Sequence, residues 1–224
     1  MKTRVLLLVL LTLATAIPAS AASILQFTEV QPFNTPFTFT ENSTNTATTL
    51  TASKAVDVAF DPSFCLVVGC GGVSNGIYDL ALNATSLGSA TNTAGIITQP
   101  FGGTLSITDG AVDLLTVNFT DLVQGSLDGS SPTLQASQPP DLFSGSSTVL
   151  DPTKFGVPRG FALSFSDLTN GGLGLTGSSI RSGLADATGT FSVTPTAIPE
   201  PATLVLFGTG LLGLLRVMRK APRA

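Results

Sequence analysis

The sequence predicts an all-β protein: an antiparallel β-sandwich or jelly-roll-like domain, flanked by an N-terminal signal peptide and a single C-terminal transmembrane helix. Two observations predict the domain. Apolar residues alternate with small polar residues along many short runs, and residue pairs typical of turns separate these runs. A third observation, an apolar run near each end of the chain, predicts the flanking segments. We therefore divide the chain into residues 1–21, 22–196 and 197–224.

The N-terminal segment has the three parts of a secretory signal peptide. Lys2 and Arg4 form a short positive region, residues 5–16 are apolar apart from two threonines, and Ala19-Ser20-Ala21 is a small-residue cleavage site. The alternative is an uncleaved N-terminal anchor, but the apolar run is short for one. We expect signal peptidase to cut after Ala21 and the protein to be exported.

Within residues 22–196, alternation with a period of two predicts the strands and their core-facing side chains. The core-facing residues that we expect are Phe37, Phe39, Val56, Val58, Phe60, Leu105, Ile107, Leu115, Val117, Phe119, Phe161, Leu163, Phe165, Phe191 and Val193. Turns are expected at Asp61-Pro62, Gly102-Gly103, Asp109-Gly110, Asp128-Gly129 and Asn170-Gly171-Gly172.

One pattern occurs twice, as VNFTDLVQG from Val117 and as LSFSDLTNG from Leu163. In both copies we expect Phe to face the core at the end of a strand, Asp to cap the following turn, and Gly to take a positive φ. The two copies would then be equivalent strands of two sheets.

Charge and composition exclude several classes of function. Residues 22–200 contain four basic and 14 acidic residues, a formal net charge of −10, which opposes binding to nucleic acid or anionic lipid. The chain contains no histidine, so it cannot form a Ser-His-Asp or a Cys-His catalytic site. It has no phosphate-binding loop, no Gly-x-Ser-x-Gly motif and no calcium loop. We therefore expect no enzymatic activity, no catalytic residue, no bound metal and no cofactor.

A carbohydrate-binding or carbohydrate-cleaving module is an alternative of a different class. Cleavage would need paired carboxylates, and Asp109 and Asp113 are close in sequence, but we interpret them as turn-capping and solvated. Sugar-binding surfaces usually carry stacking aromatic rings; the chain has no Trp, and only Tyr78 has the right character. A cleft with paired carboxylates would favour this alternative, whereas scattered surface aspartates would not.

Cys65 and Cys70 are a candidate disulfide in an exported protein. Five residues of extended strand would separate their Cα atoms by about 17 Å, whereas a disulfide needs about 5.5–6 Å, so the chain would have to turn at the nearby glycines. The alternative is two unpaired thiols in a buried strand, and the residues alone leave both open. Zinc is not expected, because two cysteines without histidine do not complete its usual four ligands.

The C-terminal segment combines a Pro-Glu-Pro tripeptide, an apolar run and a basic end. Residues 202–215 carry no charge, and a helix over residues 201–218 would be about 27 Å long, close to the thickness of a bilayer core. By the positive-inside rule, the basic residues that follow stay on the cytoplasmic side, retain the segment in the membrane and leave the domain outside. These residues are Arg216, Arg219, Lys220 and Arg223.

This arrangement resembles the PEP-CTERM sorting signal. Three features carry the resemblance: the tripeptide Pro199-Glu200-Pro201, the apolar run interrupted by glycines, and the basic tail. The resemblance covers residues 197–224. It implies an exported bacterial protein that its tail holds in the inner membrane, until an exosortase, a membrane-embedded cysteine protease, recognises Pro-Glu-Pro and releases or transfers it. The family is associated with exopolysaccharide and biofilm matrix, so the resemblance implies a non-enzymatic cell-surface or extracellular-matrix protein. A permanently anchored envelope protein with an unprocessed tail is the alternative.

Overall fold

The structure, a computed structural model, describes residues 22–30, 36–62, 65, 72–138, 143–151 and 155–195. These residues form thirteen β-strands, and every pairing between them is antiparallel. The strands are β1 (Ala22–Glu29), β2 (Phe37–Glu41), β3 (Thr48–Phe60), β4 (Gly76–Ser86), β5 (Thr91–Thr93), β6 (Ile96–Asp109), β7 (Val112–Ser126), β8 (Thr133–Gln138), β9 (Phe143–Ser146), β10 (Phe155–Ser166), β11 (Leu175–Thr176), β12 (Ser179–Ile180) and β13 (Gly183–Pro195).

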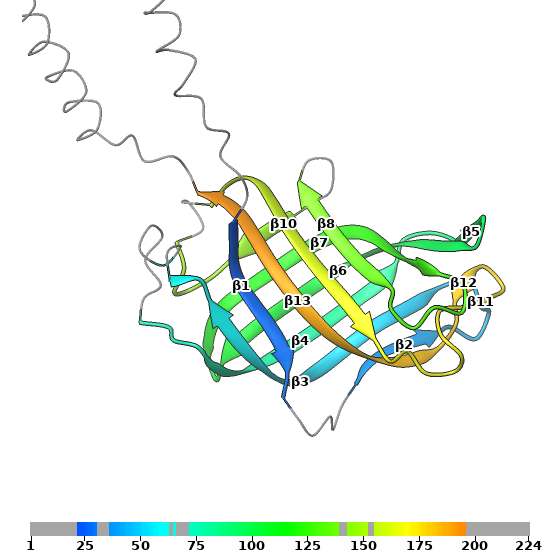
Figure 1. Cartoon of the computed structure of the whole chain (residues 1–224), viewed down its shortest axis with the longest axis horizontal. Coiled ribbons are helices and arrows are strands. Elements are labelled where there is room, and N and C mark those ends of the chain that lie inside the picture. Colours follow the sequence, from blue (N-terminus) through cyan, green and yellow to red (C-terminus); the bar gives the residue numbers. More distant parts are fainter. Residues whose placement is uncertain are drawn as a thin grey trace, which may run out of the picture.

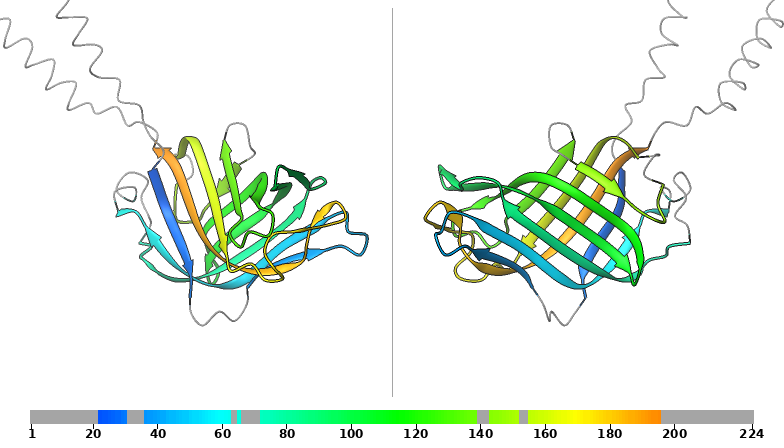
Figure 2. Two further views of the ribbon diagram at one scale, coloured as in Figure 1. Left: turned by 45° about the vertical axis from the view of Figure 1, so that its right-hand side comes forward. Right: turned by 180° about the vertical axis from the view of Figure 1, so that it is seen from behind.

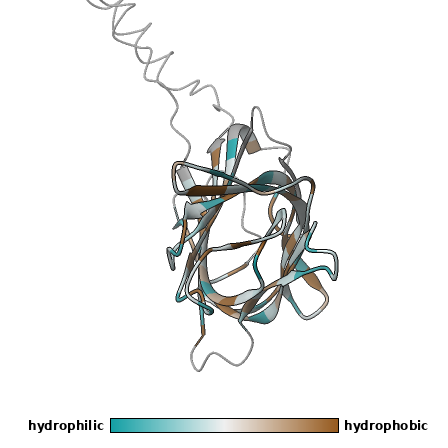
Figure 3. Cartoon of the chain, turned by 90° about the vertical axis from the view of Figure 1, so that its right-hand side faces the viewer, coloured by the Kyte–Doolittle hydropathy of each residue, from teal (hydrophilic) through white to brown (hydrophobic). Residues whose placement is uncertain are grey.

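Eight of these strands close into a barrel (Figures 1 and 3). The order around the ring is β1, β3, β4, β6, β7, β8, β10 and β13, and β13 pairs again with β1. Each barrel strand lies beside the next barrel strand along the chain, so the topology is an up-and-down meander. The prediction of an all-β antiparallel protein is confirmed, and the prediction of a β-sandwich or jelly roll is wrong.

Strand length and two glycines explain the closure. Strands β3, β4, β6, β7, β10 and β13 contain 11 to 15 residues, and strands this long twist and coil enough to bring the two edges of a sheet together. Gly103 and Gly189 lie where the wall is most crowded: a Cβ on Gly103 would lie 2.5 Å from Ala84, and one on Gly189 would lie 2.0 Å from the ring of Phe27. Glycine therefore permits the tight curvature at both places.

Two positions in the ring are each shared by two strands. β1 pairs with residues 56–60 of β3, and β2 runs in the same direction along residues 48–51 of the same strand. β8 and β9 share a position along β7 in the same way. The barrel wall is therefore interrupted at two places, and polar side chains lie at the first of these breaks.

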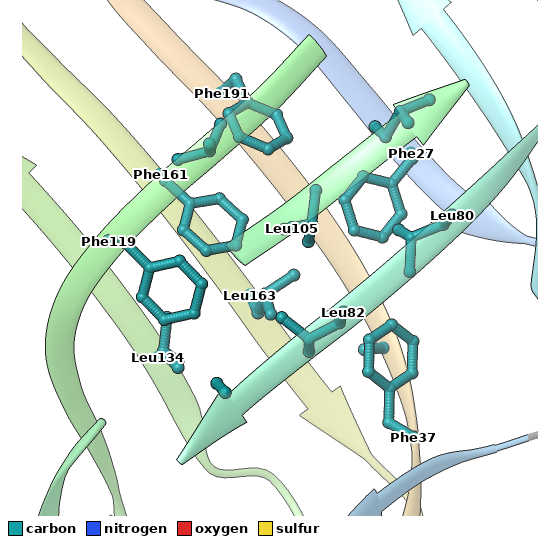
Figure 4. Close-up of a cluster of buried hydrophobic side chains, with 14 of the residues drawn as sticks. Phe27, Phe37, Leu80, Leu82, Leu105, Phe119, Leu134, Phe161, Leu163 and Phe191 are labelled. Atoms are coloured by element: carbon teal, nitrogen blue, oxygen red, sulfur yellow. The ribbon is translucent and has the colours of Figure 1, made fainter. Parts of the chain in front are cut away.

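Apolar side chains fill the barrel. Every core-facing residue that the alternation predicted is buried. The ring of Phe161 stacks on that of Phe191 with the centroids 4.8 Å apart, and lies 5.3 Å from the ring of Phe119 (Figure 4). These ring contacts join β7, β10 and β13 in the interior of the barrel.

One end of the barrel is covered by the hairpin of β11 and β12. The side chain of Gln99, which is buried, donates a hydrogen bond to the carbonyl of Gly88 (3.0 Å) and accepts one from the N–H of Ile180 (2.9 Å). The hydroxyl of Thr48 donates to the carbonyl of Ile180 (2.7 Å). Because buried polar groups need partners, these bonds fasten the hairpin over the core.

Some turn predictions are wrong. Gly102-Gly103 lies inside β6, and Asp121 of the first repeated pattern lies inside β7. The second copy does end in a turn, since β10 ends at Ser166 and both Asn170 and Gly171 have positive φ. The two copies therefore have different structures, and they are not equivalent strands of two sheets.

The described chain begins and ends at the same end of the barrel, because β1, which starts at Ala22, pairs with β13, which finishes at Pro195 (Figure 1). We call this the terminal end. The opposite end, with β5, β11 and β12, is called the far end.

Candidate functional site

The sorting residues predicted from the sequence lie outside the described part of the chain, as do the predicted signal peptide and transmembrane helix. They are Pro199, Glu200, Pro201, Arg216, Arg219, Lys220 and Arg223. β13 extends to Pro195, so the predicted tripeptide begins four residues after the last barrel strand in the sequence. Among the residues described, no helix is long and apolar enough to cross a membrane.

A buried ion pair inside the barrel escaped the sequence prediction. The Nζ atom of Lys54 lies 2.5 Å from Oε2 of Glu29, and the two side chains are 4% and 3% exposed. The ring centroid of Phe37 lies 5.3 Å from the same Nζ atom. Removing two charges from water costs several kcal/mol each, so this pair depends on the attraction between its members and on further contacts.

The ion pair lies at the break between β1 and β2. Residues 186–188 of β13 pass this break, between those that pair with β1 and those that pair with β2. There the N–H of Ala187 donates a hydrogen bond to Oε1 of Glu29 (2.6 Å). Glu29 thus connects its own strand to β13 through this bond and to β3 through Lys54. We interpret the pair as a structural link that holds the barrel closed where its wall is interrupted.

The other basic side chains in the described ranges contact backbone carbonyls. Arg159 donates to two carbonyls near the start of its own strand, and Arg181 donates to the carbonyl of Gly172 (3.0 Å). In the described ranges the exposed charged residues are all aspartates: Asp57, Asp79 and Asp109 toward the terminal end, and Asp128 and Asp167 at the far end. The described surface is therefore anionic, which opposes contact with nucleic acid or anionic lipid.

The residues considered for carbohydrate chemistry are dispersed. Asp109 is exposed at the end of β6, whereas Asp113 is half-buried and accepts hydrogen bonds from the hydroxyls of Thr116 (3.0 Å) and Ser146 (3.4 Å). Asp113 is therefore partly solvated, and its carboxylate also links the end of β9 to β7. Tyr78 is buried, and its hydroxyl donates to a backbone carbonyl (2.6 Å). In the described ranges no group of three or more Cys, Asp or Glu side chains is placed to hold a metal.

Cys65 is half-buried and takes part in a disulfide. Its N–H donates to the carbonyl of Asp61 (3.2 Å), so the chain turns directly after β3. Cys70 lies outside the described residues, and its pairing with Cys65 stays a prediction.

Comparison with known proteins concerns the tail. The model of the PEP-CTERM protein-sorting motif matches residues 197–220. No curated protein and no solved structure matches the chain. The sorting motif therefore carries the identification: it implies an exported precursor that passes through the membrane and is targeted to an exosortase. The chain is a protein with a PEP-CTERM sorting domain.

Proposed function

We propose that this protein is a non-enzymatic component of the bacterial cell surface or extracellular matrix. In this proposal residues 1–21 direct export, residues 197–224 hold the precursor in the inner membrane, and an exosortase acts at Pro199-Glu200-Pro201. The observation that carries the proposal is the sorting motif at residues 197–220, which begins two residues after the last barrel strand ends.

The chemistry of the tripeptide supports its role as the processing site. A residue that precedes proline avoids the α region, so two prolines favour an extended chain ahead of the apolar run. Glu200 is charged and stays in water beside the bilayer. A membrane-embedded protease needs such an extended and accessible segment. The tripeptide begins four residues after Pro195, so the protease would act close in sequence to the last barrel strand.

Features of the barrel support a structural role. A closed ring leaves no long open sheet edge, which limits edge-to-edge aggregation in a crowded matrix. The exposed aspartates are scattered between the two ends of the barrel, which disfavours a glycosidase with two facing carboxylates. We propose exopolysaccharide as the matrix component around the released barrel. Sedimentation of the protein with purified matrix polysaccharide tests this, and a protein that stays in the supernatant at every ratio contradicts it.

The experiment that tests the sorting proposal replaces Pro199, Glu200 and Pro201 by alanine in a host that contains the exosortase. The helix can then extend backward and the charge is lost, so we expect the variant to stay in the membrane with its full tail. Replacing Thr196 and Ile198 by alanine is the matched control, and this variant should be released like the wild type.

Two results would contradict the proposal. Release of the triple variant with the same mass as the released wild type would show that the tripeptide is not read. Retention of the wild type itself in the membrane, at full tail length and in the presence of the enzyme, would support the permanently anchored alternative.

A further inference from the structure

An exposed apolar row crosses the outer surface of the barrel at β6 and β7. Pro100 lies directly opposite Leu122 in the register of these strands. Leu87 follows β4; its N–H donates to the carbonyl of Pro100 (2.8 Å), and its side chain lies over Gly102, where an added Cβ would be 3.0 Å away. Leu87 is 62% exposed and Leu122 is 46% exposed. The three apolar side chains therefore form one continuous row that water contacts.

The surroundings of this row carry no charge. We define the uncharged face as the outward-facing positions within residues 83–87, 98–104, 118–124 and 133–135, which are Ser, Thr, Asn, Gln or Gly apart from the row itself. Gln135 lies opposite Leu122 on β8 and extends the face past the row. Asp121 falls within the range but has the inward register, and its Oδ2 atom is buried. The right-hand view of Figure 2 shows β4, β6 and β7 side by side on this face.

The distribution of charge indicates what covers this face. The exposed aspartates lie toward the two ends of the barrel, so two copies that meet through the uncharged face keep these like charges out of the contact. An apolar centre with an uncharged polar rim is also the usual composition of a protein–protein interface. A neutral glycan is less suited, because no outward position of the face carries an aromatic ring for a sugar to stack on.

We propose that the uncharged face is a self-association surface, through which a second copy of this chain docks side by side. Four strands spaced by about 4.8 Å and about six residues of each strand, at about 3.3 Å per residue, give a footprint of about 400 Å² per copy. A standard interface buries about 800 Å² per partner, so the contact is weak, with a Kd on the order of 10⁻⁴ M. A larger fraction of copies associates through such a weak contact where they are concentrated at a surface or in a matrix. In this respect the inference rests on the proposed function.

Analytical ultracentrifugation of the protein purified from its host tests the proposal, at concentrations up to about 1 mM, which bracket the expected Kd. The wild type should shift from monomer toward dimer as its concentration rises, and the shift should persist at high salt because no ion pair is involved. Leu122→Asp places a carboxylate at the centre of the face on both copies and should weaken association at least tenfold. Leu122→Thr, which keeps a residue that favours strands, should weaken it severalfold.

The matched control is Leu184→Asp, because Leu184 is 42% exposed on β13, outside the uncharged face. This variant should associate like the wild type. A wild type that remains monomeric over the whole range overturns the proposal, and so does an equal loss of association in the control. Binding of neutral dextran by a monomeric wild type, lost in Leu122→Asp, would assign the face to a glycan and also overturn it. The wild type and the two variants carry the same tail, cleaved or not, so the difference between Leu122→Asp and Leu184→Asp distinguishes failure here from failure of the sorting proposal.

Discussion

Replacing Lys54 by methionine should destabilise the barrel strongly, because the carboxylate of Glu29 would stay buried without its cation. Methionine keeps the length and flexibility of the lysine side chain, so the packing changes little. Both side chains of the pair are almost wholly buried. Removing one member of such a pair typically costs about 3–5 kcal/mol, a large part of the about 5–15 kcal/mol that holds a domain folded.

A second substitution should recover most of this loss. In the double variant Lys54→Met with Glu29→Gln, both members of the buried pair are neutral, and the amide oxygen can still accept the hydrogen bond from the N–H of Ala187. We expect the double variant to lie within about 1–2 kcal/mol of the wild type, because neutral groups are less costly to bury than charges. The double variant should therefore be more stable than Lys54→Met alone.

Urea unfolding followed by circular dichroism measures both values, provided that the slopes of the transitions are equal. Two results would show that a buried unpaired carboxylate is not the cause. One is a loss below about 1 kcal/mol for Lys54→Met, the range of exposed ion pairs. The other is a double variant no more stable than the single one, because the cost would then not come from a stranded carboxylate.

Three further predictions concern Gly189 in the barrel wall, the β11–β12 hairpin that covers one end of the barrel, and the disulfide. Gly189→Ala should cost at least about 1–3 kcal/mol in urea unfolding, because its Cβ would overlap the ring of Phe27. Gln99→Leu should cost about 1–3 kcal/mol and increase amide exchange at Ile180, since it removes both buried side-chain bonds that Gln99 makes. Reduction of the disulfide of Cys65 should lower the melting temperature. If this disulfide closes the predicted short loop to Cys70, the loss of stability should be about 2 kcal/mol.

Each of these predictions has a control. Gly76→Ala should be tolerated better than Gly189→Ala, because the nearest atom to its Cβ would be 3.8 Å away. Gln26→Leu changes an exposed glutamine and should stay within about 0.5 kcal/mol of the wild type. Reduction of a Cys65→Ser variant should change nothing further. Equal effects in a variant and its control would contradict the corresponding prediction.

Alternation in the sequence predicted the core-facing side chains on β2, β3, β6, β7, β10 and β13, but it did not identify β1, β4 and β8 of the barrel. Side chains such as Phe161, Leu163 and Phe165 alternate with small polar residues, and all three are buried. The pattern is local, and it states which face of a strand is apolar. It does not state which strands pair, and the pairing of β1 with β13 that closes the ring joins residues at opposite ends of the domain. A barrel and a sandwich therefore have the same alternation.

Residue pairs typical of turns predicted turns less well, because glycine also occurs inside curved strands. The pair Gly102-Gly103 has the composition of a turn, yet Gly103 is needed because Ala84 of the neighbouring strand lies so close. Asp121 likewise lies inside a strand, although the same pattern at Asp167 falls in a turn. Such short motifs do not predict whether a strand ends at them, because this depends on tertiary packing.

The buried ion pair carried a signal that could have been used. Leu50, Ala52, Lys54 and Val56 share one phase of the alternation in β3, and that phase is the one that faces the core. A lysine at an inward position requires a partner, so its register alone predicts a buried anion nearby. The identity of that partner could not be predicted, because Glu29 reaches Lys54 only through the pairing of β1 with β3.

Intact mass spectrometry of the wild-type protein, recovered separately from the envelope and from the medium, shows whether the exported protein is processed at its tail. We expect the protein in the medium to begin at Ala22 and to lack the apolar run after Pro199-Glu200-Pro201, and the envelope fraction to contain the precursor with the tail. A protein found only in the envelope with residues 197–224 intact, in cells that contain the exosortase, would contradict this expectation.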